Sequence, residues 1–324
     1  MKRSVLLLQL DGKIPNIALM RIAAHHQALG DEVSLRWGAQ PMRELWDNPD
    51  RVYASAIFEK TRPQVEAFKK EFPEAIIGGT GVDVGSTLES FGISTLRQEY
   101  SIYPQWRQSI GFTQRGCRLK CPFCVVPRKE GKIRFEQTIA ELWRGEPWPR
   151  ELILLDNDFF GQPDWRERIK EIREGNFKVS FNQGINARFL SDEAAQAIAT
   201  VDYRSDSMRE KRIYTAWDNS KDELTLMRGL ARLVRYGVKP GHIMVYMLIG
   251  YWPLETEDDW LYRQHTLRDF GCDPYPMPFV RSPATVGFQR WVVGHYDKRI
   301  SWSDWKANQY RPENLIQRAR EAAK

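Results

Sequence analysis

The chain has 324 residues, a formal net charge of +6 and 42% apolar residues. The length suggests about two domains. It contains no run of about 18 uncharged apolar residues, so we expect no membrane span and no membrane partner. Of its four cysteines, three are clustered. That usage excludes a disulfide framework and favours a reducing cytoplasm.

Residues 1–98 are predicted to form a Rossmann-like α/β domain. Their first apolar run, 5–10, is too short for a signal peptide and meets Asp11 too soon, so we interpret it as a strand. Further elements follow in alternation, with helices at 16–29 and 63–72 and strands at 33–37, 52–58 and 75–78. Strands that alternate with helices indicate a parallel sheet.

A glycine-rich segment, Gly78–Gly81, follows the fourth predicted strand. Glycines at the carboxyl end of a strand can admit the phosphate or nucleotide portion of a cofactor. They also form tight loops that need a positive φ, which is the commoner use.

Residues 99–108 are predicted as a linker, because Tyr103-Pro104 breaks any helix. Residues 109–275 then repeat strand–helix units, and such repeats curl into a barrel or an open part of one. The strands are expected at 110–113, 151–155, 177–181, 212–216 and 243–249, and the helices at 165–173, 191–199, 222–236 and 257–270. Residues 271–278 look irregular, and a sixth strand near 278–280 is disfavoured by prolines. Residues 276–324 are predicted as a short C-terminal extension, with a helix at 312–323.

Three cysteines, Cys117, Cys121 and Cys124, lie close together in the sequence. Thiolates so spaced can converge on one metal centre, and three ligands leave one position of an iron–sulfur cube open. A structural zinc site would need a fourth ligand. The five histidines and Cys272 all lie far away in the sequence. Buried or free thiols without a metal are the other alternative.

The C-x3-C-x2-C spacing, with Phe123 before the last cysteine, resembles the signature of radical S-adenosylmethionine (SAM) enzymes. The resemblance implies a [4Fe–4S] cluster on Cys117, Cys121 and Cys124, and SAM chelated by the unique iron. It also implies reductive cleavage of SAM to a 5′-deoxyadenosyl radical, oxygen sensitivity, and a partial (β/α)6 barrel. A reduced flavodoxin or ferredoxin is the implied electron donor. Phe123 would pack near the adenine.

Polar residues follow the predicted barrel strands, where the chemistry of such folds gathers. The resemblance implies that several of them contact SAM: Asp156, Asn157, Asp158, Asn182, Gln183, Arg188, Asp218 and Gly250. Each group has a structural alternative. Asp156 and Asp218 could cap the segments that follow them, and Asn182-Gln183-Gly184 could be a turn. Arg188 could pair with Asp192 on the surface.

The N-terminal region resembles the cobalamin-binding-type or methylthiotransferase-type Rossmann domain of many radical-SAM enzymes. The usual cobalamin fingerprint, Asp-x-His-x-x-Gly, is incomplete. Asp11 and Gly12 are present, but no histidine precedes His25, and His25 and His26 fall inside a predicted helix. Three N-terminal cysteines for a second cluster are also absent. Cobalamin is therefore not expected, and a cobalamin-dependent methyltransferase remains an alternative.

Seven basic residues lie between Arg115 and Arg134, against one acidic residue, Glu130. They could form a rim for an anionic substrate such as nucleic acid, or offset the negative charge of thiolates and a cluster. A non-catalytic zinc- or cluster-containing nucleic-acid-binding protein is therefore a second hypothesis. C-terminal aromatic residues could serve as its base-stacking platform, although packing is their commoner role: Phe279, Phe288, Trp291, Tyr296, Trp302 and Trp305. The preferred hypothesis is a radical-SAM enzyme whose substrate, and any role of Cys272, the sequence does not identify.

Overall fold

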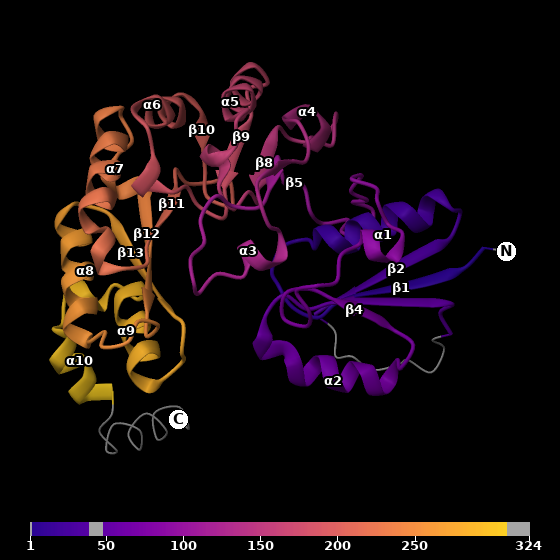
Figure 1. Ribbon diagram of the computed structural model, residues 1–324, viewed down its shortest axis with the longest axis horizontal. Helices are drawn as coiled ribbons and strands as arrows, with labels where there is room; N and C mark the ends of the chain where they lie inside the picture. Colours follow the sequence, from indigo (N-terminus) through magenta and orange to yellow (C-terminus); the bar gives the residue numbers. More distant parts are fainter. Residues whose placement is uncertain (1, 39–47, 310–324) are drawn as a thin grey trace, which may run out of the picture. The chain divides into compact units, whose positions relative to one another are not determined.

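The protein is a mixed α/β structure with parallel sheets, seen here in a computed structural model that describes residues 2–38 and 48–309 (Figure 1). It divides into two compact units, Met1–Val179 and Ser180–Lys324, which we describe separately. The α/β class predicted from the sequence is confirmed. The division falls inside the span predicted as one barrel, and the predicted domain boundaries stay a prediction.

The first unit contains a four-stranded parallel sheet in the order β2-β1-β3-β4. Its elements are β1 (Ser4–Gln9), α1 (Ile17–Ala28), β2 (Glu32–Trp37), β3 (Arg51–Ser55), α2 (Arg62–Glu71) and β4 (Ile76–Gly78). The two helices lie on opposite faces of the sheet (Figure 1). Alternation along β1 explains why: Leu6 and Leu8 pack with Phe68 of α2, whereas Val5 and Leu7 pack with the apolar face of α1.

The third strand ends at Ser55, three residues before its predicted end at 58. Both carboxylate oxygens of Asp11 accept backbone hydrogen bonds just beyond it, from Ile57 N (2.7 Å) and Phe58 N (2.8 Å). The same carboxylate accepts a bond from Thr61 Oγ1 at 2.7 Å. Those backbone groups are thereby turned away from the sheet, and Asp11 acts as a local cap.

The predicted linker 99–108 is anchored by two buried tyrosines, Tyr100 and Tyr103. Tyr103 Oη donates to Gln9 Oε1 (2.6 Å) and accepts from Asn16 N (3.2 Å). Tyr100 Oη accepts from Ile110 N at 3.0 Å. The connector is therefore bonded to the first sheet at one end and to the next strand at the other.

The rest of the first unit surrounds the cysteine segment. Its elements are β5 (Ser109–Gly111), β6 (Gln114–Arg115), α3 (Val126–Lys129), β7 (Arg134–Phe135), α4 (Ile139–Leu142), β8 (Glu151–Leu154) and α5 (Trp165–Glu174). Strands β5 and β8 pair in parallel. Strands β6 and β7 pair antiparallel, with Gln114 opposite Phe135, and close the base of the loop that carries the three cysteines.

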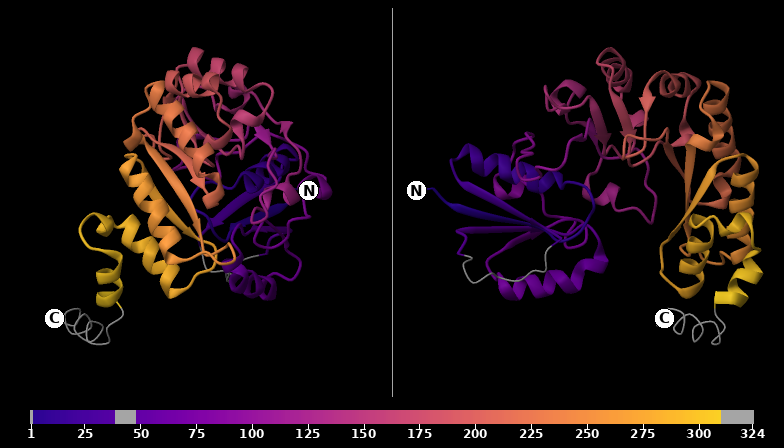
Figure 2. Two further views of the ribbon diagram at one scale, coloured as in Figure 1. Left: turned by 60° about the vertical axis from the view of Figure 1, so that its left-hand side comes forward. Right: turned by 180° about the vertical axis from the view of Figure 1, so that it is seen from behind.

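Strand β9 (Lys178–Phe181) spans the division between the units, and the second unit continues with a parallel sheet in the order β11-β12-β13. Its elements are α6 (Asp192–Thr200), β10 (Asp202–Tyr203), β11 (Ile213–Trp217), α7 (Glu223–Arg235), β12 (Ile243–Ile249), α8 (Glu257–Asp269), β13 (Asp273–Pro278), α9 (Pro283–Val293) and α10 (Trp302–Gln309). Helices α7 and α8 lie along one face of the three-stranded sheet (Figures 1 and 2). In the described part of the chain, β5 and β8 belong to a different sheet from β11–β13, and no barrel is seen.

Strand β13 corrects one expectation, because residues 271–278 were expected to be irregular. It pairs in parallel with β12, with Tyr246 opposite Tyr275. Its prolines occupy alternate positions, 274, 276 and 278, while Phe279 N donates to Ile249 O. The missing N–H groups therefore fall on the side of β13 away from β12, where a strand tolerates proline.

The C-terminal aromatic residues divide between packing and exposure. Phe288, Trp291, Trp302 and Trp305 are buried, and the Phe288 and Trp302 rings lie 5.2 Å apart in an edge contact. Packing is thus confirmed for these four, while Phe279 and Tyr296 stay exposed. The helix predicted at 312–323 lies outside the described residues.

Candidate metal and cofactor site

The two ends of the cysteine loop, at Gly116 and at residues 130–132, are in contact. Gly116 has φ +85°, and a side-chain carbon there would lie 2.4 Å from Lys132 O, so only glycine fits. Its N–H donates to Glu130 Oε2 (2.9 Å), and Cys117 N donates to Gly131 O (3.4 Å). The segment that carries the cysteines is held closed by backbone contacts independent of any metal.

The three cysteines are half-buried, and none of them forms a disulfide. Leu119 N donates to Cys117 Sγ at 3.4 Å, and Cys124 N donates to Cys121 O at 3.0 Å. Burial raises the pKa of Cys117 to about 11, and the charges of Asp158, Cys121 and Cys124 add to the increase. Cys117 therefore has to lose a proton when it binds a metal.

Within residues 2–38 and 48–309, no three His, Cys, Asp or Glu side chains are grouped so as to hold a metal ion. A single zinc ion needs its sulfur ligands at about 2.3 Å from one point. An iron–sulfur cube instead takes each thiolate on a different iron, so its ligands are spread more widely. Three thiols on one closed loop are the type of donor set that such a cluster takes.

Asp156 lies directly after β8 and fixes the chain that leads into the cysteine loop. It is fully buried, and its Oδ1 accepts hydrogen bonds from Thr113 N (2.9 Å), Thr113 Oγ1 (2.7 Å) and Gln114 N (2.7 Å). Its Oδ2 has no hydrogen-bond partner in the described part of the chain. Burial raises the pKa of Asp156 to about 7, and the bonds from Thr113 and Gln114 oppose that rise.

The next two residues contact the cysteine loop directly. Asn157 Nδ2 donates to Glu130 Oε2 at 2.9 Å. Asp158 pairs with Arg118 of the loop, with 2.9 Å between Arg118 Nε and Asp158 Oδ2. The structure therefore brings Asp156, Asn157 and Asp158 to the cysteine segment, as their place at a strand end predicts.

Glu130 is a site residue that the sequence analysis did not select. Its carboxylate accepts from Gly116 N and Asn157 Nδ2 and pairs with Arg115 at 3.3 Å. The signal was present in the sequence, because Glu130 is the one acidic residue in a strongly basic window. A lone carboxylate among cations is a natural point of convergence.

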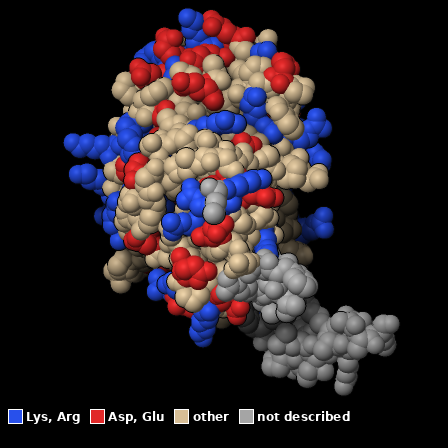
Figure 3. Space-filling view, turned by 90° about the vertical axis from the view of Figure 1, so that its right-hand side faces the viewer, with Lys and Arg blue, Asp and Glu red and all other residues tan. Residues whose placement is uncertain are grey.

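Several cations of this window have protein partners already. Beyond Arg115 and Arg118, Arg134 donates to Glu130 O (2.6 Å), and Lys129 Nζ donates to Thr80 Oγ1 (2.7 Å). Figure 3 shows Lys and Arg side chains interspersed with Asp and Glu over the face that it draws. In the described structure, two of the seven basic residues of the window are thus in ion pairs, and two more bond to a carbonyl and a hydroxyl group.

In the second unit, Arg188 and Asp218 belong to one charged group. Arg188 Nη1 lies 2.5 Å from Asp222 Oδ2, and its Nε donates to Asn186 Oδ1 at 3.2 Å. Burial raises the pKa of Asp218 to about 6; Arg188 lowers it and Asp222 adds to the increase. Asp192, the surface partner named as the structural alternative for Arg188, pairs with Arg232 at 3.4 Å instead.

Asn182 and Gln183 form the tight turn that was the structural alternative for them. Gly184, with φ +84°, donates its N–H to Phe181 O at 2.9 Å, and Gln183 Nε2 donates to Asn182 Oδ1 at 2.7 Å. Gly250 also has a positive φ, +74°, and its N–H donates to Glu255 Oε2 at 2.7 Å. Phe123 is half-buried in the cysteine loop. Whether any of these residues contacts SAM stays a prediction.

The N-terminal histidines pack within the fold. His26 is buried, and its ring nitrogens lie 2.8 Å from Asp31 Oδ2 and 3.0 Å from Tyr53 Oη.

Gly79 has φ +104°, and a side-chain carbon there would lie 2.2 Å from Ala56 O. The tight-loop interpretation of the glycine-rich segment is thereby confirmed. Cys272 is buried, and burial raises its pKa to about 12.

No helix among the described residues is both long and apolar enough to cross a membrane. No protein-family model matches the chain, and no curated protein matches it.

Proposed function

We propose that this protein is a radical-SAM enzyme that holds a [4Fe–4S] cluster on Cys117, Cys121 and Cys124. The observation that carries the proposal is the closed cysteine loop. Three half-buried thiols lie on one segment whose two ends are bonded together by the β6–β7 pair and by Glu130. No local fourth ligand accompanies them in the sequence, so one corner of a cube remains for SAM.

When bound and reduced, the cluster would supply the electron that cleaves SAM and starts hydrogen abstraction from the substrate. The chain's own residues hold this centre. Asp156 and Glu130 fix the entry to the loop, and the pair of Arg118 with Asp158 ties the loop to the segment after β8.

The SAM contacts are proposed from residues at strand ends. In the second unit, Arg188 and Asp218 share one charged group and offer both charge signs that a zwitterionic amino acid needs. Asn182, Gln183 and Gly250 remain proposed contacts for the ribose and adenine parts, and Phe123 for the adenine. A reduced flavodoxin or ferredoxin is the proposed electron donor.

The test is anaerobic reconstitution with iron and sulfide, followed by dithionite and SAM. We expect 5′-deoxyadenosine from the wild type and none from Cys117→Ala, Cys121→Ala or Cys124→Ala. Cys272→Ala is the matched control, because it removes a buried thiol outside the loop, and it should retain product formation. Stoichiometric zinc with no SAM cleavage would instead support the binding-module hypothesis.

Two further measurements test the accompanying proposals. Replacing dithionite with reduced flavodoxin or ferredoxin should sustain 5′-deoxyadenosine formation if either protein is the donor. Cobalamin absorption in protein purified after supplementation would revive the methyltransferase alternative, and its absence would end it.

A further inference from the structure

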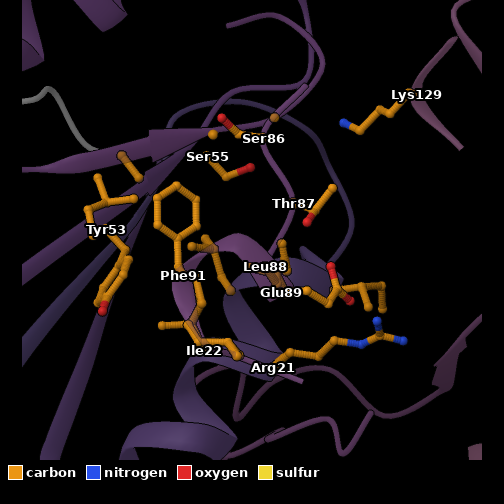
Figure 4. A pocket seen from close by; sticks show the side chains of 18 of the residues that line it. Arg21, Ile22, Tyr53, Ser55, Ser86, Thr87, Leu88, Glu89, Phe91 and Lys129 are labelled. Carbon is orange, nitrogen blue, oxygen red and sulfur yellow. The ribbon is translucent and has the colours of Figure 1, made fainter. Parts of the chain in front are cut away.

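A cavity of about 230 Å³ lies in the first unit, at the carboxyl ends of β3 and β4 (Figure 4). Ser55 ends β3 and Gly78 ends β4, and both line it. Ligands of parallel α/β sheets bind outside the carboxyl ends of the strands. The cavity therefore occupies the edge of the sheet where a ligand is expected.

The walls of the cavity are largely apolar. Side chains from α1, β3, β4 and the segment after β4 supply them, among them Ile22, Ile76, Leu88, Phe91 and Ile93. Figure 4 shows Phe91 and Ile22 on the same side of the space, with Tyr53 beyond them. Such walls suit a flat, apolar ligand body.

The charged lining is predominantly basic. Arg21, Arg115, Lys129 and Arg134 border the cavity, against Glu89 and Glu136. Arg115 pairs with Glu130, and Arg21 pairs with Glu136 at 2.5 Å, both of these last side chains being buried. The positive charges of Lys129 and Arg134 then remain against the negative charge of Glu89, and this excess favours an anionic ligand.

Arg21 provides an observation that points to a ligand directly. Its side chain is only 8% exposed, and its Nε is buried with no hydrogen-bond partner in the described part of the chain. Glu136 balances the charge of Arg21, but the buried Nε–H donor is left unsatisfied, which is costly. An oxygen atom of an anion in the cavity would satisfy it.

Lys129 supplies a second cation from another part of the unit. It ends α3, five residues after Cys124, and its Nζ donates to Thr80 Oγ1 in the glycine-rich segment. Figure 4 shows its amino end directed toward the segment that carries Ser86 and Thr87. Figure 4 draws Lys129, beside Ser86 and Thr87, at the opposite edge of the view from Arg21. An anion in the cavity could therefore be held by the ammonium group with the hydroxyl groups, and the arginine Nε–H offers a separate polar contact.

We propose that this cavity binds a small organic anion with a flat apolar body and one carboxylate or phosphate group. The apolar walls take the body, Lys129 takes the acidic group, and the Nε–H of Arg21 is a second polar contact for the ligand. The proposal goes beyond the proposed function, because binding at this cavity requires neither the cluster nor SAM. An empty packing void is apolar and dry, whereas this one carries cations and an unpaired buried donor.

The test uses the full chain as purified, without reconstitution, and the fluorescent probe 8-anilinonaphthalene-1-sulfonate. The probe should bind at one site and be displaced by phenyl phosphate or by benzoate. Benzyl alcohol has the same ring without the charge, and it should displace the probe at least ten-fold more weakly. Comparing phenyl phosphate with benzoate tells which acidic group the site prefers.

Two variants and a matched control locate the binding. Lys129→Gln should weaken binding of the preferred anion roughly ten-fold or more, the worth of a charge-assisted hydrogen bond. Arg21→Lys keeps the charge but removes the Nε–H, and it should weaken binding as well. Lys69→Gln removes one positive charge from the exposed face of α2, away from the cavity lining, and should change nothing. Circular dichroism checks that each variant is folded.

The proposal is overturned by any of three results: no saturable binding, displacement by benzyl alcohol as strong as by the anions, or an equal effect of Lys129→Gln and Lys69→Gln. Because no cluster or SAM is present, these results are independent of the 5′-deoxyadenosine assay. Failure of the radical-SAM proposal leaves this one standing, and the reverse also holds.

Discussion

Arg263 and Glu255 form a buried ion pair in the second unit that joins the ends of two neighbouring strands. Arg263 Nη1 donates to Trp217 O and to Leu248 O, each at 3.0 Å, and its Nη2 binds Glu255. Glu255 in turn accepts the N–H of Gly250 at 2.7 Å. The ends of β11 and β12 are therefore fixed by one arginine of α8.

Replacing Arg263 with methionine should strongly destabilise the protein, because Glu255 and two carbonyls lose their buried partner. We expect a loss of about 3–5 kcal/mol in the free energy of unfolding, measured by urea denaturation. Lys69→Met breaks the exposed pair with Glu66 and should cost less than about 1 kcal/mol. Equal losses would show that the Arg263 network adds no more than a surface pair.

Asp156 should make stability fall as the pH rises. Its pKa in the fold is about 7, above the ordinary value of 3.8 for an aspartate, so the folded protein binds the proton more tightly than the unfolded chain. Its contribution is complete below about pH 4 and is lost as the pH rises to about 7, with a slope of at most about 1.4 kcal/mol per pH unit. Urea denaturation between pH 4.5 and 7.5 measures it. Asp156→Asn should remove this slope, and an unchanged slope would assign it to another group.

Gly116 and Gly131 offer a matched test of the cysteine loop, because both have a positive φ, +85° and +72°. An added methyl group at Gly116 meets Lys132 O at 2.4 Å, whereas at Gly131 it meets nothing within 4 Å. Both alanine variants carry the left-handed strain of about 1–2 kcal/mol, and only Gly116→Ala also displaces the loop. We expect Gly116→Ala to take up much less iron on reconstitution than Gly131→Ala. Similar uptake by the two would contradict the closed-loop argument.

The carboxyl group of Asp218 should respond in opposite directions to its two charged neighbours. Its pKa is raised to about 6 by burial, lowered by Arg188 and raised by Asp222. Arg188→Gln should therefore raise the pKa of Asp218 further, and Asp222→Asn should lower it. A ¹³C NMR titration of labelled aspartate measures both shifts. If both substitutions shifted the pKa of Asp218 in the same direction, the Arg188–Asp222 pair would act on Asp218 by holding the local structure and not through its charges.

The α/β class and most elements were predictable, because apolar periodicity and helix caps are local signals. Val5 and Leu7 alternate with Leu6 and Leu8 toward opposite faces, and the helix predicted from residue 16 begins after an Asn16 cap. Strand β13 was not predictable from the sequence, because proline normally breaks a strand. Whether a strand tolerates proline depends on which of its sides is unpaired in the folded sheet.

Partners distant in sequence were less predictable. A pair of Arg188 with nearby Asp192 was the structural alternative, but Arg188 pairs with Asp222, which helix α6 and strands β10 and β11 separate from it in the sequence. The role of Glu130 depends on Gly116 and Asn157 meeting at one carboxylate. The cavity beside Arg21 depends on several segments, from α1 to Glu136, closing together. Such convergence is a property of the folded chain, and no local pattern encodes it.

The pairing of β6 with β7 has a consequence for how metal and stability are coupled. Gln114 already lies opposite Phe135. The entropic cost of closing the cysteine loop is therefore met when the chain folds, before any iron binds. Chelation should therefore leave the cysteine loop closed and the chain folded, and only the binding free energy of the metal is lost from the stability. This behaviour is opposite to that of zinc fingers, which unfold when their ion is stripped away.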